Sequence, residues 1–138
     1  MALEARHLAA GFGLARAAFG LSYVLAPHAG ARGWVGEEEA RRGGTQLAFR
    51  SLGARDLALG AGAAFAALSE NGRAATPWLA AHAVADLADT AGSMTASGIP
   101  ERGRRLGAAV AGASATASAA LAIVCALQPA QRQGCPFG

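Results

Sequence analysis

The stretch at residues 106–127, LGAAVAGASATASAALAIVCAL, decides how this chain folds. It holds no Asp, Glu, Arg, Lys or His, and its only ionisable side chain is the thiol of Cys125. A helix on the surface of a soluble protein carries charged residues along one whole face, at every third or fourth position. Because this stretch has no such face, it predicts a helix that crosses a membrane.

Three more segments of similar length and low charge precede it, at about residues 8–26, 45–68 and 76–97. About 20 helical residues match the ~30 Å hydrocarbon thickness of a bilayer. Residues that form turns or break helices separate the segments, among them Pro27, Asn71, Pro100 and Pro129. The sequence therefore predicts an all-α protein, a single domain over residues 1–138 that forms an antiparallel bundle of four transmembrane helices.

The overall composition agrees with a single ordered domain but does not decide whether water or lipid surrounds it. The chain has 138 residues, of which 53% are hydrophobic and 15% charged, and its mean hydropathy is +0.29. These values exclude a disordered chain and suit one core. They also fit a soluble bundle of alanine-rich helices, which the distribution of the charges disfavours. All 12 basic residues are arginines scattered along the chain, so we expect no nucleic acid as a partner. The four apolar segments make the lipid bilayer the expected partner.

The first connector, residues 28–44, is the longest and the most charged. Glu37 with Arg41, and Glu38 with Arg42, are spaced four residues apart, as in ion pairs on one helix face. This spacing predicts a short helix that lies at the membrane interface.

Arginine is unevenly divided between the two sides of the predicted bundle. The first and third connectors together hold six arginines, whereas the opposite side holds Arg6, Arg73 and Arg132. Cytoplasmic loops of membrane proteins are enriched in arginine and lysine. We therefore expect a multi-pass protein of the cytoplasmic (inner) membrane, with both connectors in the cytoplasm and both termini outside it.

Ionisable residues inside the predicted spans form a candidate intramembrane polar network. Each such group costs about 2.5–3.5 kcal/mol at the bilayer centre, so it normally faces other helices and pairs. With histidine neutral, three arginines balance three aspartates. The candidate residues are Arg16, Arg50, Arg55, Asp56, His82, Asp86 and Asp89.

Counting residues from the membrane faces gives each charge a depth, because neighbouring helices run in opposite directions. Asp89 and Arg50 both lie nearer the inner face, which predicts that they pair. Arg16 and Arg55 lie close to the middle of the bilayer, where we expect them to meet Asp56 and Asp86.

The third segment carries a polar stripe at three- and four-residue steps, formed by His82, Asp86, Asp89, Thr90, Ser93 and Ser97. Such a stripe either holds helices together or lines a polar pocket. In a pocket, His82 beside Asp86 would form a proton-accepting pair near neutral pH.

Small residues recur at four-residue steps in the fourth segment, at Gly107, Ala111, Ala115 and Ala119. The second segment contains the glycines Gly53, Gly60 and Gly62. Small side chains allow two helix backbones to approach closely, so we expect these positions to serve packing.

No catalytic or metal-binding motif is present in the sequence. The run GAGAAF at residues 60–65 imitates a dinucleotide-binding loop but lacks its third glycine and a preceding strand. Cys125 and Cys135 have no metal-ligand spacing with each other or with the histidines. We predict no catalytic residue, no metal and no cofactor, with a quinone as the alternative.

Three runs resemble a known group of proteins. They are GLAR at residues 13–16, RSLGARDLALG at 50–60 and ADLADT at 85–90. Together they resemble the DoxX-like small bacterial four-helix membrane proteins, most closely uncharacterised domain families with a GARDxxLG pattern in the second helix. The resemblance implies a compact four-helix bundle in the cytoplasmic membrane. Better-known members of the wider group are associated with membrane oxidoreductase assemblies and quinone-linked sulfur oxidation, but no cofactor ligand here carries that activity over.

Three functions fit these observations. The first is a non-enzymatic or accessory bundle held by its Arg/Asp network, which associates with a second copy of itself or with a membrane redox partner. The second is a subunit of a membrane oxidoreductase assembly that binds a quinone or another small lipophilic molecule through Arg55, Asp56, His82 and Asp86. The third is a small transporter. A cavity flanked by His82 and Asp86 would favour the second or third function, and a closed, saturated network would favour the first.

Overall fold

The computed structural model describes residues 2–69 and 72–128, and helices are the only regular secondary structure in this part of the chain. The predictions for Asn71, Pro129, Arg132 and Cys135 lie outside the described residues. The elements, in order, are α1 (Ala2–Leu25), α2 (Pro27–Val35), α3 (Glu37–Ala40), α4 (Gly43–Leu68), the 3-10 turn η1 (Gly72–Ala75), α5 (Thr76–Thr95) and α6 (Glu101–Ala126). The predicted all-α class is thus confirmed for the described residues.

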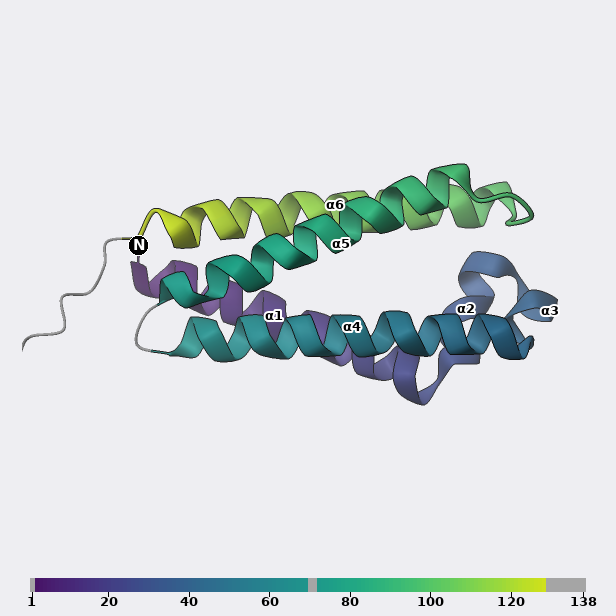
Figure 1. The fold of residues 1–138 in the computed structure, drawn as a ribbon, viewed down its shortest axis with the longest axis horizontal. Helices are drawn as coiled ribbons and strands as arrows, with labels where there is room; N and C mark the ends of the chain where they lie inside the picture. Colours follow the sequence, from purple (N-terminus) through teal and green to yellow (C-terminus); the bar gives the residue numbers. More distant parts are fainter. Residues whose placement is uncertain (1, 70–71, 129–138) are drawn as a thin grey trace, which may run out of the picture.

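The four long helices form two antiparallel pairs that lie side by side (Figure 1). Helix α1 packs along α4, and α5 packs along α6. Fewer contacts, chiefly between α4 and α5, between α1 and α6 and between α2 and α6, join the two pairs. The space between the pairs is where the candidate site lies.

The long helices coincide with the four predicted segments to within a few residues, except that α1 and α6 begin earlier. Both have an acidic residue in the first turn, Glu4 in α1 and Glu101 in α6, which stabilises the positive end of the helix dipole. Among the described residues, α1 and α6 are the two helices long and apolar enough to cross a membrane by length and composition, so the four predicted spans stay a prediction. Helix α4 contains three charged residues, and α5 has 20 residues with two aspartates beyond its middle.

The first connector contains two short helices instead of the one predicted. Pro27, expected to close the first helix, begins α2 instead, because proline suits the first helical position, where no N–H partner is needed. Gly36, with φ of 89°, separates α2 from the single turn of α3. The Glu37–Arg41 pair forms at 2.6 Å, but the predicted Glu38–Arg42 pair is wrong: Arg42 pairs with Glu39 at 3.0 Å.

Glycines bring the backbones of α1 and α4 into direct contact. A Cβ placed on Gly13 would lie 2.7 Å from the carbonyl oxygen of Gly60, and one on Gly20 would lie 2.5 Å from that of Gly53. Side chains cannot be accommodated at these distances. The packing role predicted for Gly53 and Gly60 is confirmed, while Gly62 lies against the indole ring of Trp78 on α5.

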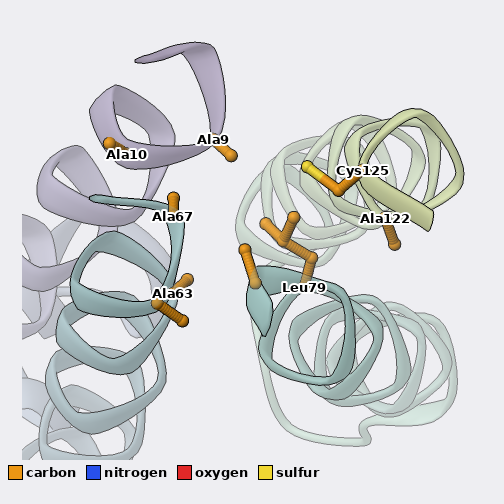
Figure 2. Packing of buried hydrophobic residues seen from close by; sticks show 9 residues of the cluster. Ala9, Ala10, Ala63, Ala67, Leu79, Ala122 and Cys125 are labelled. Atoms are coloured by element: carbon orange, nitrogen blue, oxygen red, sulfur yellow. The ribbon is translucent and has the colours of Figure 1, made fainter. Parts of the chain in front are cut away.

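The buried core is made largely of alanine. Its main cluster lies at the end of the molecule that holds the N-terminus, where α1 and α4 face α5 and α6 across small side chains (Figure 2). The labelled residues of this cluster are Ala9, Ala10, Ala63, Ala67, Leu79, Ala122 and Cys125. Large apolar side chains instead point outward, for example Phe65 at 80% exposure and Val84 at 68%. This arrangement reverses the usual placement in soluble proteins, where large apolar residues fill the interior.

Candidate functional site

A buried arginine on α1 joins all four long helices. Arg16 Nη2 donates to Asp86 Oδ1 of α5 at 2.8 Å and lies 3.1 Å from Asp56 Oδ1 of α4. Its Nη1 donates to Ser114 Oγ of α6 at 3.1 Å. Both aspartates are almost completely buried, so this guanidinium balances charges that water does not reach.

A second guanidinium extends this group along α4 and α5. Arg55 donates to both oxygens of Asp89, with Nη2 2.6 Å from Oδ2 and Nη1 3.1 Å from Oδ1. The Nη2 atom also lies 3.0 Å from Asp56 Oδ1. Asp56 is therefore shared by the two arginines. We call these five residues, Arg16, Arg55, Asp56, Asp86 and Asp89, the polar network.

The predicted pairing of Arg50 with Asp89 is wrong, because Arg55 binds that carboxylate. Arg50 is exposed and forms no ion pair among the residues that the structure describes. Five residues separate the two arginines, which turns their side chains about 140° apart around α4. The depth counted from the sequence therefore does not decide the pairing. It is decided by the direction around α4, and Arg50 lies on an exposed side of that helix.

His82 does not join the network. Its side chain is fully buried, yet neither ring nitrogen has a hydrogen-bond partner within the described part of the chain. The ring instead meets Phe12 of α1 edge-on, with 6.1 Å between ring centroids. The predicted proton-accepting pair of His82 with Asp86 is not formed: Asp86 Oδ1 accepts from Arg16, and Asp86 Oδ2 has no hydrogen-bond partner among the described residues.

A pocket of about 310 Å³ opens beside the polar network, between the two helix pairs. Its charged lining consists of Arg16, Asp56, Asp86 and Asp89, and its aromatic lining of Phe19, Tyr23 and Trp34. The remaining lining residues are small or apolar, and they are Leu52, Ala88, Gly92, Ser93, Ala96, Ile99, Val110 and Ala111. His82 is not one of the lining residues.

The aromatic lining was missed by the sequence analysis. Phe19 and Tyr23 follow Arg16 by three and seven residues, so the helical repeat places them on the same face of α1, a signal that could have been used. Trp34 reaches the pocket because α2 folds back toward α6, where its backbone and indole ring lie against Gly103 and Gly107. No local sequence pattern predicts that contact.

The charge of the site differs from the predicted balance. With Arg50 outside the polar network and His82 neutral, two arginines face three aspartates, which leaves the network with a net charge of −1. The predicted neutral inventory of three arginines and three aspartates is wrong for this reason.

The charged connector lies apart from this site. Partial desolvation opposes the change, but the positive charges of His28 and Arg41 and their hydrogen bonds lower the pKa of Glu37 below its usual value. The Glu37 carboxylate is 3.1 Å from His28 Nε2 and 2.6 Å from Arg41 Nη2. These contacts fix α3 against the start of α2.

Within the described residues, no group of three His, Cys, Asp or Glu side chains is placed to hold a metal ion. Cys125 is a free thiol buried in the alanine core, and Cys135 lies outside the described residues.

Comparisons of the chain with protein-family models, with curated proteins and with solved structures found no match to any of them. The resemblance to the DoxX-like proteins therefore stays a prediction.

Proposed function

We propose that this chain is a four-span protein of the cytoplasmic membrane that binds a small lipophilic molecule in the pocket beside its polar network. Binding, and not catalysis, is the function that we assign to it. A quinone belongs to this class of ligand. Association with a second copy of the chain or with a membrane redox partner stays a prediction.

The outward position of the large apolar side chains supports the membrane location. Leu87 and Val84 on α5, and Leu47 and Phe65 on α4, are all more than half exposed. Water would make such surfaces unfavourable, whereas lipid tails solvate them. At 1.5 Å per residue, α4 and α5 are about 39 and 30 Å long, enough to cross a bilayer with α1 and α6.

The inward position of the buried charges supports the same proposal. Asp56 and Asp86 are 2% and 1% exposed, and both bind Arg16 in the space between the helices. Charged groups at bilayer depth normally face the helix bundle and pair. Asp56 and Asp86 are thus withdrawn from the surface, while the Arg55–Asp89 pair is about one-third exposed. Exposed Arg50 can extend toward the headgroups.

The ends of the molecule differ in arginine content in the sense that we expected. The end with α2 and α3 holds Arg32, Arg41, Arg42, Arg102, Arg104 and Arg105, and the described part of the opposite end holds Arg6 and Arg73. We assign the arginine-rich end to the cytoplasm, which places both termini outside it.

The single observation that carries the binding role is the pocket with an unsatisfied Asp86 in its wall. Asp86 Oδ2 is buried and has no hydrogen-bond partner among the described residues, and the same holds for Arg16 Nε. Buried polar groups are nearly always paired, and of the unmatched buried atoms in the described residues these two are the ones that belong to residues lining this pocket. The pocket volume of about 310 Å³ lies at the lower end of the usual range for small-ligand sites.

Native mass spectrometry tests this proposal on protein released gently from its membrane. We expect a peak whose mass equals that of the 13.7 kDa chain plus the mass of one small molecule. Gly92 lines the pocket, and a Cβ on it would meet nothing within 4 Å, so Gly92→Leu should fill the pocket and abolish this peak.

Gly11→Leu is the matched control, because Gly11 also has open space around its Cβ and does not line the pocket. This variant should retain the bound molecule. A wild-type protein that carries no small molecule, or a Gly92→Leu variant that still carries it, would contradict the binding role.

A further inference from the structure

The pocket has an excess of negative charge in its lining. Three of its four charged lining residues are the carboxylates of Asp56, Asp86 and Asp89, and Arg16 is the fourth. Arg55 approaches Asp56 and Asp89 from outside the lining. Even with both arginines counted, one negative charge is left uncompensated. An uncompensated charge away from water is unfavourable, so the site is incomplete without a proton or a cation.

This excess can be assigned to one side chain. Asp86 is 1% exposed, and its Oδ1 already accepts a hydrogen bond from Arg16. Its Oδ2 accepts none from the described residues. Asp89, by contrast, has both oxygens bound by Arg55. Asp86 therefore lines the pocket with a carboxylate whose second oxygen accepts no hydrogen bond from the described residues, and its negative charge attracts a cation.

Three aromatic side chains form another part of the pocket lining. Phe19 and Tyr23 lie with their ring centroids 4.5 Å apart, and Trp34 adds an indole from α2. The negative faces of aromatic rings attract cations, and aromatic walls recognise ammonium groups with alkyl substituents. Carboxylates combined with such rings favour a cation over a neutral or an anionic ligand.

We infer that the ligand of this pocket is a small lipophilic organic cation, an amine or quaternary ammonium whose positive nitrogen lies between Asp86 and the aromatic residues Phe19, Tyr23 and Trp34. This inference rests on the proposed binding function. It narrows the ligand class, because the same pocket could hold an uncharged molecule if shape and apolar contact alone decided binding.

The cation competes with a proton for the same negative charge. The ionisable groups around Asp86 are Arg16 and Tyr23 from α1, Arg55 and Asp56 from α4, and His82 and Asp89 from α5; the lining residues from α6, Val110 and Ala111, carry none. Protonation of the carboxylates removes the excess charge. Affinity for the cation should then fall as the pH is lowered, by up to about tenfold per pH unit when one proton is exchanged.

The test is equilibrium binding to the full chain in lipid nanodiscs, with benzyltrimethylammonium as the probe and neopentylbenzene as its uncharged isostere. We expect the cation to bind at least about tenfold more tightly than the isostere. Asp86→Asn should remove this preference and its pH dependence, and Asp86→Glu should retain both. Glu101→Gln, a surface control outside the pocket, should change neither.

Three further variants, none of them in the polar network, extend the test. Trp34→Leu should weaken binding of the cation more than that of the isostere, while Trp34→Phe retains the preference. His82→Gln should leave the pH dependence in place. Loss of that dependence in His82→Gln would assign the proton to the imidazole and overturn the competition at the carboxylates.

The outcomes separate this inference from the proposed function. Equal binding of cation and isostere, with both lost in Gly92→Leu, would overturn the inference and retain a pocket for neutral lipophiles. Binding of the cation that is unaffected by both Asp86→Asn and Trp34→Leu would overturn the inference as well. Failure of both probes to bind, with no small molecule in native mass spectra, would overturn the proposed function too.

Discussion

Arg16 is the residue on which the polar network depends, because it alone binds both of the most deeply buried carboxylates. Replacement by methionine keeps a similar length but leaves Asp56 with Arg55 and Asp86 with no guanidinium. Removal of one partner from a buried ion pair costs about 3–5 kcal/mol. We expect Arg16→Met to lower the free energy of unfolding by about that amount, measured by denaturant titration in detergent micelles.

The double variant Arg16→Met, Asp86→Asn is the control for this prediction. It removes both charges of the pair, so it should recover a large part of the lost stability. An Arg16→Met variant that unfolds at the wild-type denaturant concentration would contradict the central position of Arg16.

Arg50 and Arg55 are a matched pair of arginines on one helix, and the structure gives them different roles. Arg55 binds Asp89 through two hydrogen bonds, and Arg50 is exposed without an ion pair among the described residues. Since the Arg55 pair is about one-third exposed, its loss in Arg55→Gln should cost on the order of 1–2 kcal/mol. Arg50→Gln should change the free energy of unfolding little.

Exchange of the charges tests the pairing directly. Arg55→Asp combined with Asp89→Arg should be more stable than either single reversal, as judged by the same unfolding titration. The corresponding exchange of Arg50 and Asp89 should give no such recovery. Recovery with Arg50 in place of Arg55 would restore the pairing that residue depth alone predicts.

For individual residues, the sequence predicted which side chains form the site better than it predicted which of them pair. The aspartates and Arg16 stand out because ionisable groups are rare within long apolar segments. Depth could be counted from the sequence, but the choice between Arg50 and Arg55 depends on the direction around α4. The absence of a hydrogen bond between His82 and Asp86 could not be predicted, because a four-residue spacing places two side chains on one helix face without fixing their orientation.

Among the helices, the most extensive contact is that of α1 with α4, and it depends on glycines that have no side chain. Gly11 and Gly13 lie on the same helix: a Cβ on Gly13 would be 2.7 Å from backbone atoms of α4, and one on Gly11 would meet nothing within 4 Å. We expect Gly13→Ala to lower stability by about 1–3 kcal/mol, because the two helices must move apart.

Gly11→Ala is the matched control, and it should raise stability by up to about 1 kcal/mol through its higher helix propensity. Thermal unfolding of both variants in the same detergent makes the comparison. Equal behaviour of the two substitutions would show that the backbones of α1 and α4 are not in contact at Gly13.

The sequence predicted the long helices well because their boundaries carry local signals. Pro77 lies in the first turn of α5, and Gly98 with Pro100 separates α5 from α6. The two-helix connector was harder to predict, since Pro27 can either end one helix or begin the next. Which of these occurs depends on tertiary contacts, such as that of the Tyr23 ring with Gly30 of α2.

For the whole molecule, the distribution of side-chain size explains the modest mean hydropathy of +0.29. The interior is made largely of alanine, with several glycines and the buried aspartates Asp56 and Asp86, and these residues add little to the average or lower it. Leucine, valine, isoleucine and phenylalanine lie largely on the outside, where lipid would cover them. Composition alone could not show this, because the same residues in a soluble protein would be arranged the other way round.

Cysteine labelling across the membrane tests the central claim, that α4 and α5 cross the bilayer together with α1 and α6. Single cysteines are introduced at Leu87 on α5 and at Glu38 on α3, both exposed, in a chain with Cys125→Ser and Cys135→Ser. A membrane-impermeant maleimide is then applied to intact cells and to inverted membrane vesicles. We predict that Glu38→Cys reacts only in inverted vesicles and that Leu87→Cys reacts in neither until detergent is added. Reaction of Leu87→Cys as fast as that of Glu38→Cys in inverted vesicles would show that water reaches α5, and would contradict the four-span account.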